Sequence, residues 1–313
     1  MNKDPHSESS YVSDAGPSIE TSGSQRLSAR KAEIGSGLTV ARLLPSRTRR
    51  TIGAWCFLDH VGPARFAPGG GLRVGPHPHI GLQTFTWMIE GEVLHRDSLG
   101  NEQVIRPSQV NLMTAGRGIA HTEESTAEAT RAHAAQLWIA LPAEQAEREP
   151  AFDHYPDLPR WEESGCTLTL LVGAHAGRSA PTQIYTPLVG LEVWAEQATV
   201  LSTPLDPAFE YGLLPLEGAA ELEGETFSAD ELAYLARGRA VLRLQLAART
   251  RALLIGGVPF GDNITIWWNF VGHNRATIAQ AQRDWEAERP RFGAIRGFAG
   301  LRMKAPEIPW LTS

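Results

Sequence analysis

The chain has 313 residues, of which 42% are hydrophobic and 20% are charged, and this balance is typical of a globular protein rather than of a disordered or membrane-spanning chain. Its formal net charge of −6 argues against a general affinity for nucleic acid, because phosphates require a strongly basic surface. The length suffices for two domains, each with its own apolar core. The sequence contains no long apolar run, no secretory signal and no paired spacing of its two cysteines, Cys56 and Cys166. We therefore expect a cytoplasmic protein without membrane contacts.

The first 30 residues are rich in serine and contain few side chains that could be buried. Low hydrophobicity of this kind does not compensate for the entropy lost on ordering. We predict a mobile tail over residues 1–30.

Short runs that favour β-strands alternate with turn signals from Leu38 onward. A turn is predicted at Ser98-Leu-Gly-Asn101, between two such runs. Strands of this length and spacing are typical of an all-β sandwich or barrel. The expected strands are Thr84–Ile89, Gln103–Ile105, Val110–Met113, Gln136–Leu141, Thr167–Val172, Leu191–Ala195, Val241–Leu246 and Ala252–Ile255.

A segment rich in Pro, Glu and Asp, from Leu141 to about Cys166, separates two β-patterned halves of similar size. We take it as the connection between an N-terminal domain, residues 31–150, and a C-terminal domain, residues 151–313. One helix is predicted near the end of the second domain. Asn274 would cap it, Ile278, Ala281 and Trp285 would share its buried face, and Pro290 would stop it.

Two pairs of metal-ligand residues occur in the first half. His77 and His79 are separated by one residue, which on a strand directs both imidazoles to one face. His121 and Glu123 repeat this spacing about 40 residues later. One such pair is a weak signal, but two pairs in β-type sequence predict a single site for one divalent metal ion.

The predicted ligand set narrows the choice of metal. Three imidazoles and one carboxylate suit iron, manganese, nickel, cobalt, copper or zinc, and would leave positions open on a six-coordinate ion. A structural zinc site would more usually include thiolates. His60 and His95 are interpreted as hydrogen-bonded polar residues near a barrel end rather than as further ligands.

Several phrases of the sequence resemble the pirin family. Gly71-x5-His77-x-His79 is similar to the first cupin motif. More specific likenesses are Phe57-Leu-Asp-His60, His77-Pro-His-Ile-Gly81, Glu90-Gly-Glu-Val-Leu-His-Arg-Asp-Ser-Leu-Gly100 and Met113-Thr-Ala-Gly-Arg-Gly-Ile-Ala-His121. The likeness continues to Trp267-Trp-Asn-Phe270, which resembles the C-terminal close of a bacterial subgroup.

The resemblance implies two tandem cupin (jelly-roll) β-barrels packed face to face, with a short C-terminal helix. It implies that the metal lies only in the N-terminal barrel, on His77, His79, His121 and Glu123, and that the ion is Fe(II). The sequence of the second half is consistent with a single metal site in the N-terminal barrel, because it contains His175 and His273 but no HxH pair. The chain departs from the family at Ile80 and Gln83, and in many cupins the ligand carboxylate lies at or near the position of Gln83.

The resemblance also implies an activity, the dioxygenation of flavonols such as quercetin with ring opening and loss of carbon monoxide. Glu123 would then take the proton of the flavonol 3-hydroxyl, and dioxygen would attack the resulting enolate. The partners would be a small flavonol-like aromatic substrate and dioxygen. The alternative is an iron-binding, redox-sensing regulatory protein that binds transcription factors or metabolic enzymes.

Overall fold

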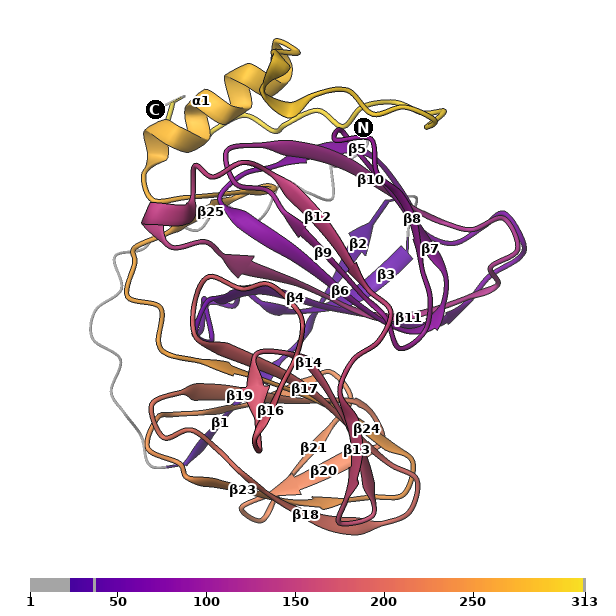
Figure 1. Cartoon of the computed structure of the whole chain (residues 1–313), viewed down its shortest axis with the longest axis vertical. Coiled ribbons are helices and arrows are strands. Elements are labelled where there is room, and N and C mark those ends of the chain that lie inside the picture. The colour runs from indigo at the N-terminus through magenta and orange to yellow at the C-terminus, as the bar shows by residue number, and fades with distance from the viewer. Residues whose placement is uncertain (1–22, 36–37, 312–313) are drawn as a thin grey trace.

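The computed structural model describes residues 23–35 and 38–311. The described chain forms two β-barrels stacked on one another, with a helix on the outer side of the N-terminal barrel (Figure 1). Each barrel consists of a seven-stranded and a four-stranded antiparallel sheet. The prediction of an all-β protein with two tandem barrels is confirmed.

The N-terminal barrel presents its four-stranded sheet away from the other barrel (Figure 1). In spatial order this sheet contains β5 (Arg73–His79), β10 (Ile119–Ser125), β7 (Val93–Asp97) and β8 (Glu102–Ile105). The seven-stranded sheet contains β12 (Ala151–Tyr155), β9 (Val110–Thr114), β6 (Leu82–Gly91), β11 (Arg131–Ala140), β4 (Trp55–Arg65), β3 (Leu38–Leu44) and β2 (Arg30–Ile34).

The C-terminal barrel repeats this plan. Its seven-stranded sheet contains β1 (Ser24–Ser28), β22 (Glu231–Leu235), β19 (Glu210–Glu217), β24 (Thr250–Gly257), β17 (Leu188–Ala195), β14 (Cys166–Val172) and β13 (Arg160–Glu163). The four-stranded sheet contains β18 (Thr199–Pro204), β23 (Val241–Leu246), β20 (Ala219–Leu222) and β21 (Glu225–Ser228). The C-terminal half also contains a two-stranded hairpin, formed by β15 (Ala174–His175) and β16 (Arg178–Ser179).

All eight strands expected from the sequence overlap observed strands, and β23 has the predicted bounds. The predicted turn at residues 98–101 joins β7 to β8. Asp97 fixes it, since its Oδ1 accepts hydrogen bonds from the backbone N–H groups of Leu99 and Asn101. An aspartate that bonds the backbone two residues ahead is a common turn device.

Each end of the described chain packs on the barrel formed mainly by the other half of the sequence. The domain boundaries in the structure therefore differ from the predicted ones. Of the predicted tail, residues 1–22 lie outside the described residues. Residues 24–28 form β1, which pairs with β22 in the C-terminal barrel. This edge strand buries Leu27 alone, so its sequence carries little hydrophobic signal. At the other boundary, β12 pairs with β9, so residues 151–155 belong to the N-terminal barrel.

The C-terminal segment packs on the N-terminal barrel rather than on its own. It contains the hairpin β25 (Thr265–Trp267) and β26 (Phe270–Gly272), helix α1 (Arg275–Glu286) and the 3₁₀ turn η2 (Pro290–Phe292). Trp285 and Phe270 are buried in one cluster with Ile80 and Ala120 of the N-terminal barrel. The helix is capped by Asn274 as predicted, but it ends before Pro290, which begins η2.

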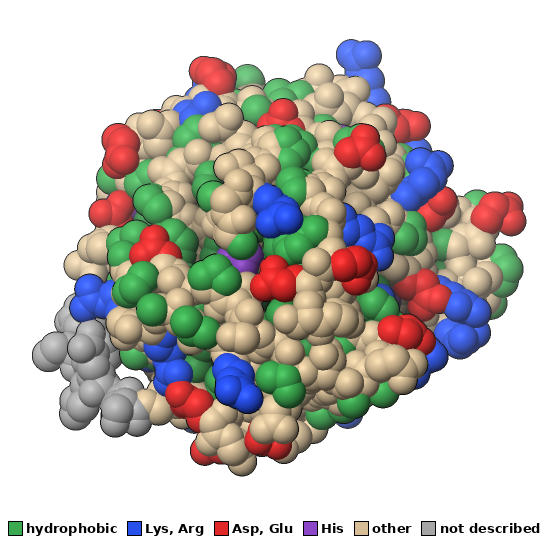
Figure 2. All heavy atoms as spheres, turned by 60° about the horizontal axis from the view of Figure 1, so that its bottom comes forward, with side chains coloured by type: hydrophobic (Ala, Val, Ile, Leu, Met, Phe, Trp, Pro, Cys, Tyr) green, Lys and Arg blue, Asp and Glu red, His purple; other side chains and the backbone are tan. Residues whose placement is uncertain are grey.

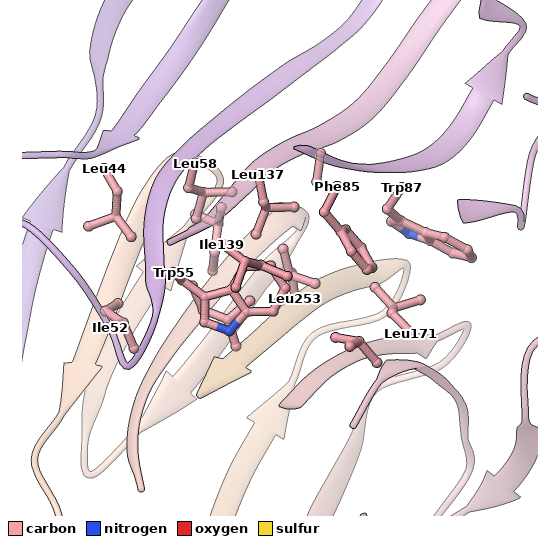
Figure 3. Packing of buried hydrophobic residues seen from close by; sticks show 14 of the residues in the cluster. Leu44, Ile52, Trp55, Leu58, Phe85, Trp87, Leu137, Ile139, Leu171 and Leu253 are labelled. Atoms are coloured by element: carbon pink, nitrogen blue, oxygen red, sulfur yellow. The ribbon is translucent and has the colours of Figure 1, made fainter. Parts of the chain in front are cut away.

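Apolar side chains from the two seven-stranded sheets form the interface between the barrels (Figure 3). Trp55, Phe85 and Leu137 come from the N-terminal barrel, and Leu171 and Leu253 come from the C-terminal barrel. The indole N–H of Trp55 donates to the carbonyl of Gly256, at 3.2 Å. A buried aromatic with its polar group satisfied contributes fully to such an interface.

His60 lies at the same interface, where it joins a polar chain between the barrels. Its Nδ1 is 2.7 Å from Asp230 Oδ1, and its Nε2 is 2.9 Å from His133 Nε2. The interpretation of His60 as a hydrogen-bonded polar residue is confirmed.

The outer surface mixes charges of both signs: Figure 2 shows Lys and Arg interspersed with Asp and Glu on the face that it presents. Within the described residues, no helix has the length and apolar character needed to cross a membrane. The remaining 3₁₀ turn, η1 (Ala143–Gln145), follows β11.

Candidate metal centre

Three imidazoles converge inside the N-terminal barrel. His77 and His79 lie on β5, and His121 lies on the neighbouring β10, directly across from His77. One ring nitrogen of each lies within 4.8 Å of the other two, and all three side chains are buried. His79 Nε2 and His121 Nε2 are 3.1 Å apart. Two nitrogens bound at right angles to one ion, each at about 2.1 Å, would lie about 3.0 Å apart.

The outer nitrogens of His77 and His79 are held by backbone carbonyls. The pairing of β5 with β10 shifts register between Val74 and His77, and Gly75 in this irregular stretch accepts a hydrogen bond from His77 Nδ1, at 2.9 Å. Asn269 accepts one from His79 Nδ1, also at 2.9 Å. A carbonyl only accepts, so each of these hydrogen bonds is donated by Nδ1 of the neutral ring. In His79 this leaves the lone pair of Nε2 directed toward His121.

The carbonyl of Asn269 comes from the turn between β25 and β26. Trp268, in the same turn, has φ +52°, a left-handed conformation that is rare for a bulky side chain. The hairpin is tied to the strand end beyond His79, because Val271 N donates to Ile80 O at 3.1 Å. The C-terminal segment thus completes the surroundings of a residue 190 positions earlier in the sequence.

The third imidazole is held by side chains instead. His121 Nδ1 lies 3.3 Å from His95 Nδ1, and His95 Nε2 lies 3.3 Å from Asp97 Oδ2. An ionised carboxylate only accepts, so a neutral His95 carries its proton on Nε2 and accepts at Nδ1. His121 must then donate from Nδ1, and its Nε2 is bare.

These tautomers leave two lone pairs facing one another across the 3.1 Å between His79 Nε2 and His121 Nε2. Such an arrangement is unfavourable unless a cation lies between the nitrogens. Metal ligands with the opposite ring nitrogen hydrogen-bonded show this pattern. The three imidazoles therefore fit a transition-metal ion of the kind that imidazole suits.

Burial keeps the imidazoles of His79 and His121 neutral. The pKa values of His79 and His121 lie well below the usual range, first because burial disfavours the charged ring and second because His77 is close. A metal ion binds only the neutral imidazole. The site is thus ready to bind metal without first losing a proton from these rings.

Glu123 lies two residues after His121 on β10 and lines the same cavity as the three imidazoles. Its carboxylate is outside the group of atoms that lie within 4.8 Å of one another. Burial raises the pKa of Glu123 to about 7. The structure therefore brings together the three predicted histidines and places the predicted carboxylate in the cavity beside them.

The side chain of Gln83 lies away from the histidines. It donates to Thr114 Oγ1, at 2.9 Å, and to the carbonyl of Gln183. Thr84, the next residue on β6, lines the cavity with the histidines, because successive side chains of a strand point to opposite faces.

The cavity around the histidines has largely aromatic and apolar walls. Phe57 and Trp138 stack with ring centroids 4.1 Å apart, and Ile266, Trp268 and Met303 come from the C-terminal segment. Polar groups at the wall include Gln136 and the Arg42–Asp59 ion pair, in which Arg42 donates twice at 2.7 Å. A small planar molecule with a few polar groups suits such walls.

The histidines of the second half do not form a comparable group. His175 is buried, and its Nε2 lies 2.8 Å from Thr203 Oγ1. His273 Nε2 donates to the carbonyl of Leu141, at 3.0 Å. Within residues 23–35 and 38–311, His77, His79 and His121 are the one group of three or more potential metal ligands this close together.

The sequence is similar throughout to known proteins. The sequence profile of the Pirin family matches residues 37–139, and that of the Pirin C-terminal cupin domain matches residues 190–293. A relative from Pseudomonas aeruginosa with the provisional name quercetin 2,3-dioxygenase is 65% identical over 286 residues, which cover 91% of each chain. A pirin-like protein of Caulobacter vibrioides is 37% identical and is matched over 84% of this chain and 93% of its own.

Solved structures agree with this family likeness. The crystal structure of a quercetin 2,3-dioxygenase from Acinetobacter baumannii superposes with a TM-score of 0.90 and 49% identity. The match covers 92% of this chain and 96% of that one. The two chains therefore share their overall fold.

Proposed function

The chain belongs to the pirin family, and we propose that it is a metal-dependent dioxygenase of the quercetin 2,3-dioxygenase type, which opens the central ring of flavonols. The observation that supports this most is the convergence of three buried imidazoles in a cavity with largely aromatic and apolar walls, with Nδ1 of His77 and of His79 held by backbone carbonyls. The names of the relatives from Pseudomonas aeruginosa and Acinetobacter baumannii agree with it.

The proposed cofactor is one divalent ion, Fe(II), held by His77, His79 and His121 with Glu123 as the fourth ligand. The donor set also suits manganese, nickel, cobalt, copper and zinc. When bound, the ion supplies a Lewis acid that favours the ionised form of the flavonol 3-hydroxyl.

Glu123 is the proposed catalytic base. In the metal-free site burial raises its pKa to about 7. With the ion bound, a carboxylate oxygen that is not coordinated can serve as the proton acceptor. Glu123 lines the cavity, so a substrate hydroxyl directed at the histidines would pass within its reach. The proton of the 3-hydroxyl would move to a Glu123 carboxylate oxygen.

The cavity walls would orient the substrate. Phe57 and Trp138, whose rings stack on one another, contribute apolar surface to the wall beside a flavonol ring, and Gln136 offers an amide to a ring hydroxyl. Trp268 and Met303, from the C-terminal segment, restrict the access of water. Exclusion of water strengthens the electrostatic effects at the reacting group.

Oxygen consumption tests the proposal. Protein loaded with Fe(II) should consume dioxygen in the presence of quercetin and bleach its near-ultraviolet absorption. Glu123→Gln should reduce turnover by a factor of about 10² or more, as expected for loss of a general base. Glu124→Gln is the matched control, because Glu124 is the next residue and pairs with Arg96 instead. Absence of turnover with each of the six metals would contradict the proposal.

A further inference from the structure

His95 lies behind His121 rather than in the cavity. It is 4% exposed and sits on β7, where its Cα partner on β10 is Glu123. Its Nδ1 faces His121 Nδ1, at 3.3 Å. The cavity that His77, His79 and His121 line does not include it, so its role is exerted through His121.

Two contacts fix the ring of His95. Phe152, from β12, stacks on it with ring centroids 4.3 Å apart and planes at 12°. Asp97 Oδ2 lies 3.3 Å from His95 Nε2. The ring plane and the direction of its nitrogens are therefore both determined by neighbouring side chains.

Asp97 is in turn held as an acceptor by the β7–β8 turn. Its Oδ1 accepts from the backbone N–H groups of Leu99 and Asn101, and its Oδ2 accepts from Asn101 Nδ2 at 2.9 Å. Although burial alone would raise it, the hydrogen bonds from His95 and Asn101 lower the pKa of Asp97. A carboxylate held in this way imposes the N–H on the facing nitrogen of His95.

We propose that His95 and Asp97 are positioning residues of the metal centre: Asp97 holds His95 with its Nδ1 lone pair toward His121, and His95 thereby keeps the His121 proton on Nδ1 and the His121 Nε2 bare. This inference rests on the metal binding in the proposed function, but not on the reaction. The backbone carbonyls of Gly75 and Asn269 do the same for His77 and His79. His121 differs in relying on side chains, so its orientation can be altered by substitution.

The chain offers a matched control in the other barrel. His175 is likewise buried, and its Nε2 hydrogen-bonds Thr203 Oγ1 at 2.8 Å. It also stacks on an aromatic ring, that of Trp161. Phenylalanine at either position keeps a flat ring and removes the hydrogen bonds, so His175→Phe reports the cost of the substitution itself.

The variants distinguish two contributions of His95, the hydrogen-bond acceptor that it offers to His121 and the flat ring that stacks on Phe152. His95→Phe keeps the stacking on Phe152 but gives His121 no acceptor. His95→Asn places an amide oxygen where Nδ1 lies, because both atoms are attached to Cγ, and so restores the acceptor. Asp97→Asn leaves one side-chain oxygen for which the turn N–H groups and His95 compete.

The experiment measures Co(II) binding to the full-length protein by competition with a chromophoric chelator, with the visible absorption of bound Co(II) as a second readout. His95→Phe should weaken binding by a factor of about 10 to 100, as loss of a partner behind a ligand does elsewhere. His95→Asn should remain within about threefold of the wild type, and Asp97→Asn should lose about tenfold. His175→Phe should bind as the wild type does, and only the His95→Phe spectrum should change.

Several outcomes would overturn the inference. Wild-type affinity in His95→Phe would do so, as would equal losses in His95→Asn and His95→Phe. If His95→Phe fails to fold, the Co(II) affinities of His95→Asn and Asp97→Asn are compared instead. Equal affinities of these two variants would contradict the proposal. Tight Co(II) binding, together with absence of quercetin turnover with each of the six metals, would refute the proposed function alone. Failure of the wild type to bind Co(II) would refute the metal site and this inference together.

Discussion

The two barrels share one architecture and differ in what fills them. The interior of the C-terminal barrel is packed with apolar side chains such as Phe227, Leu168 and Leu244, all at 0% exposure. The N-terminal barrel places His77, His79, His95 and His121 in its interior instead. Burying polar rings in this way costs free energy that apolar side chains would not. The C-terminal barrel closes without such a group, so folding of the sheets does not by itself account for the buried histidines of the N-terminal barrel.

Single buried histidines are not the distinguishing feature. His175 in the C-terminal barrel has a hydroxyl partner for its Nε2, as buried polar groups normally do. In the N-terminal barrel, the Nε2 atoms of His79 and His121 have only each other. The difference between a structural histidine and a metal ligand is here the absence of a compatible partner for one nitrogen.

The largest difference between the barrels should be in stability. Phe227→Ala removes a fully buried ring from the packed barrel and should lower the free energy of unfolding by about 3–5 kcal/mol. Phe57→Ala removes a ring that lines a cavity, and its cost should be smaller, about 1–3 kcal/mol, because less close packing is lost. Denaturant unfolding of both variants checks this. A cost for Phe57→Ala equal to or above that of Phe227→Ala would contradict the comparison.

The second largest difference should be in metal affinity, when one imidazole is removed from each barrel. His79→Ala, with an intact fold by circular dichroism, should lose more than about a hundredfold in metal affinity, since even partners behind a ligand contribute 10- to 100-fold. His175→Ala should retain the wild-type metal content. Elemental analysis of both variants, purified side by side, measures the metal content of each. Equal metal content in the two would place the ion outside the histidine group.

The pH dependence of metal binding should report Glu123. Because its pKa is raised to about 7 and those of His79 and His121 are lowered, Glu123 is the group protonated on going from pH 8 to pH 6. Metal must displace that proton, so affinity should fall by up to about tenfold per pH unit below pH 7. Glu123→Gln should flatten this dependence between pH 6 and 8, whereas Glu124→Gln should preserve it. An equal pH slope in Glu123→Gln and the wild type would count against Glu123 as a ligand.

The smallest difference between the barrels should be in the reactivity of their cysteines, because each barrel buries one free thiol. Burial raises the pKa of Cys56 to about 12 and that of Cys166 to about 11. The thiolate is the reactive form, so neither thiol should react with a disulfide reagent at pH 8 until the protein unfolds. Absorbance assays on Cys56→Ala and Cys166→Ala follow each thiol separately. Rapid labelling of one in native protein would show that its barrel opens.

The sequence predicted the ligand pairs because strand alternation is local. His77 with His79, and His121 with Glu123, each needed only the period of two along one strand. The same period explains why Gln83 lies outside the cavity and Thr84 lines it, since successive residues of a strand face opposite sides. Which of the two faces the cavity could have been predicted only with the start of β6 known to the residue.

Other features had no local signal. The carbonyl of Asn269 holds His79 from 190 residues away, and a backbone acceptor leaves no mark on side-chain patterns. Strand β1 joins the C-terminal barrel through backbone pairing while burying only Leu27. His95 was not predicted to be a ligand, and its contact with His121 depends on the pairing of β7 with β10, which one strand cannot reveal.

The central claim is that one metal ion binds among three imidazoles of the N-terminal barrel and none binds in the C-terminal barrel. A crystal structure of the metal-loaded protein, with anomalous diffraction collected at the absorption edge of that metal, tests this directly. We predict one strong anomalous peak at about 2.1 Å from the Nε2 atoms of His77, His79 and His121. A peak near His175, or none among the three imidazoles, would contradict the account.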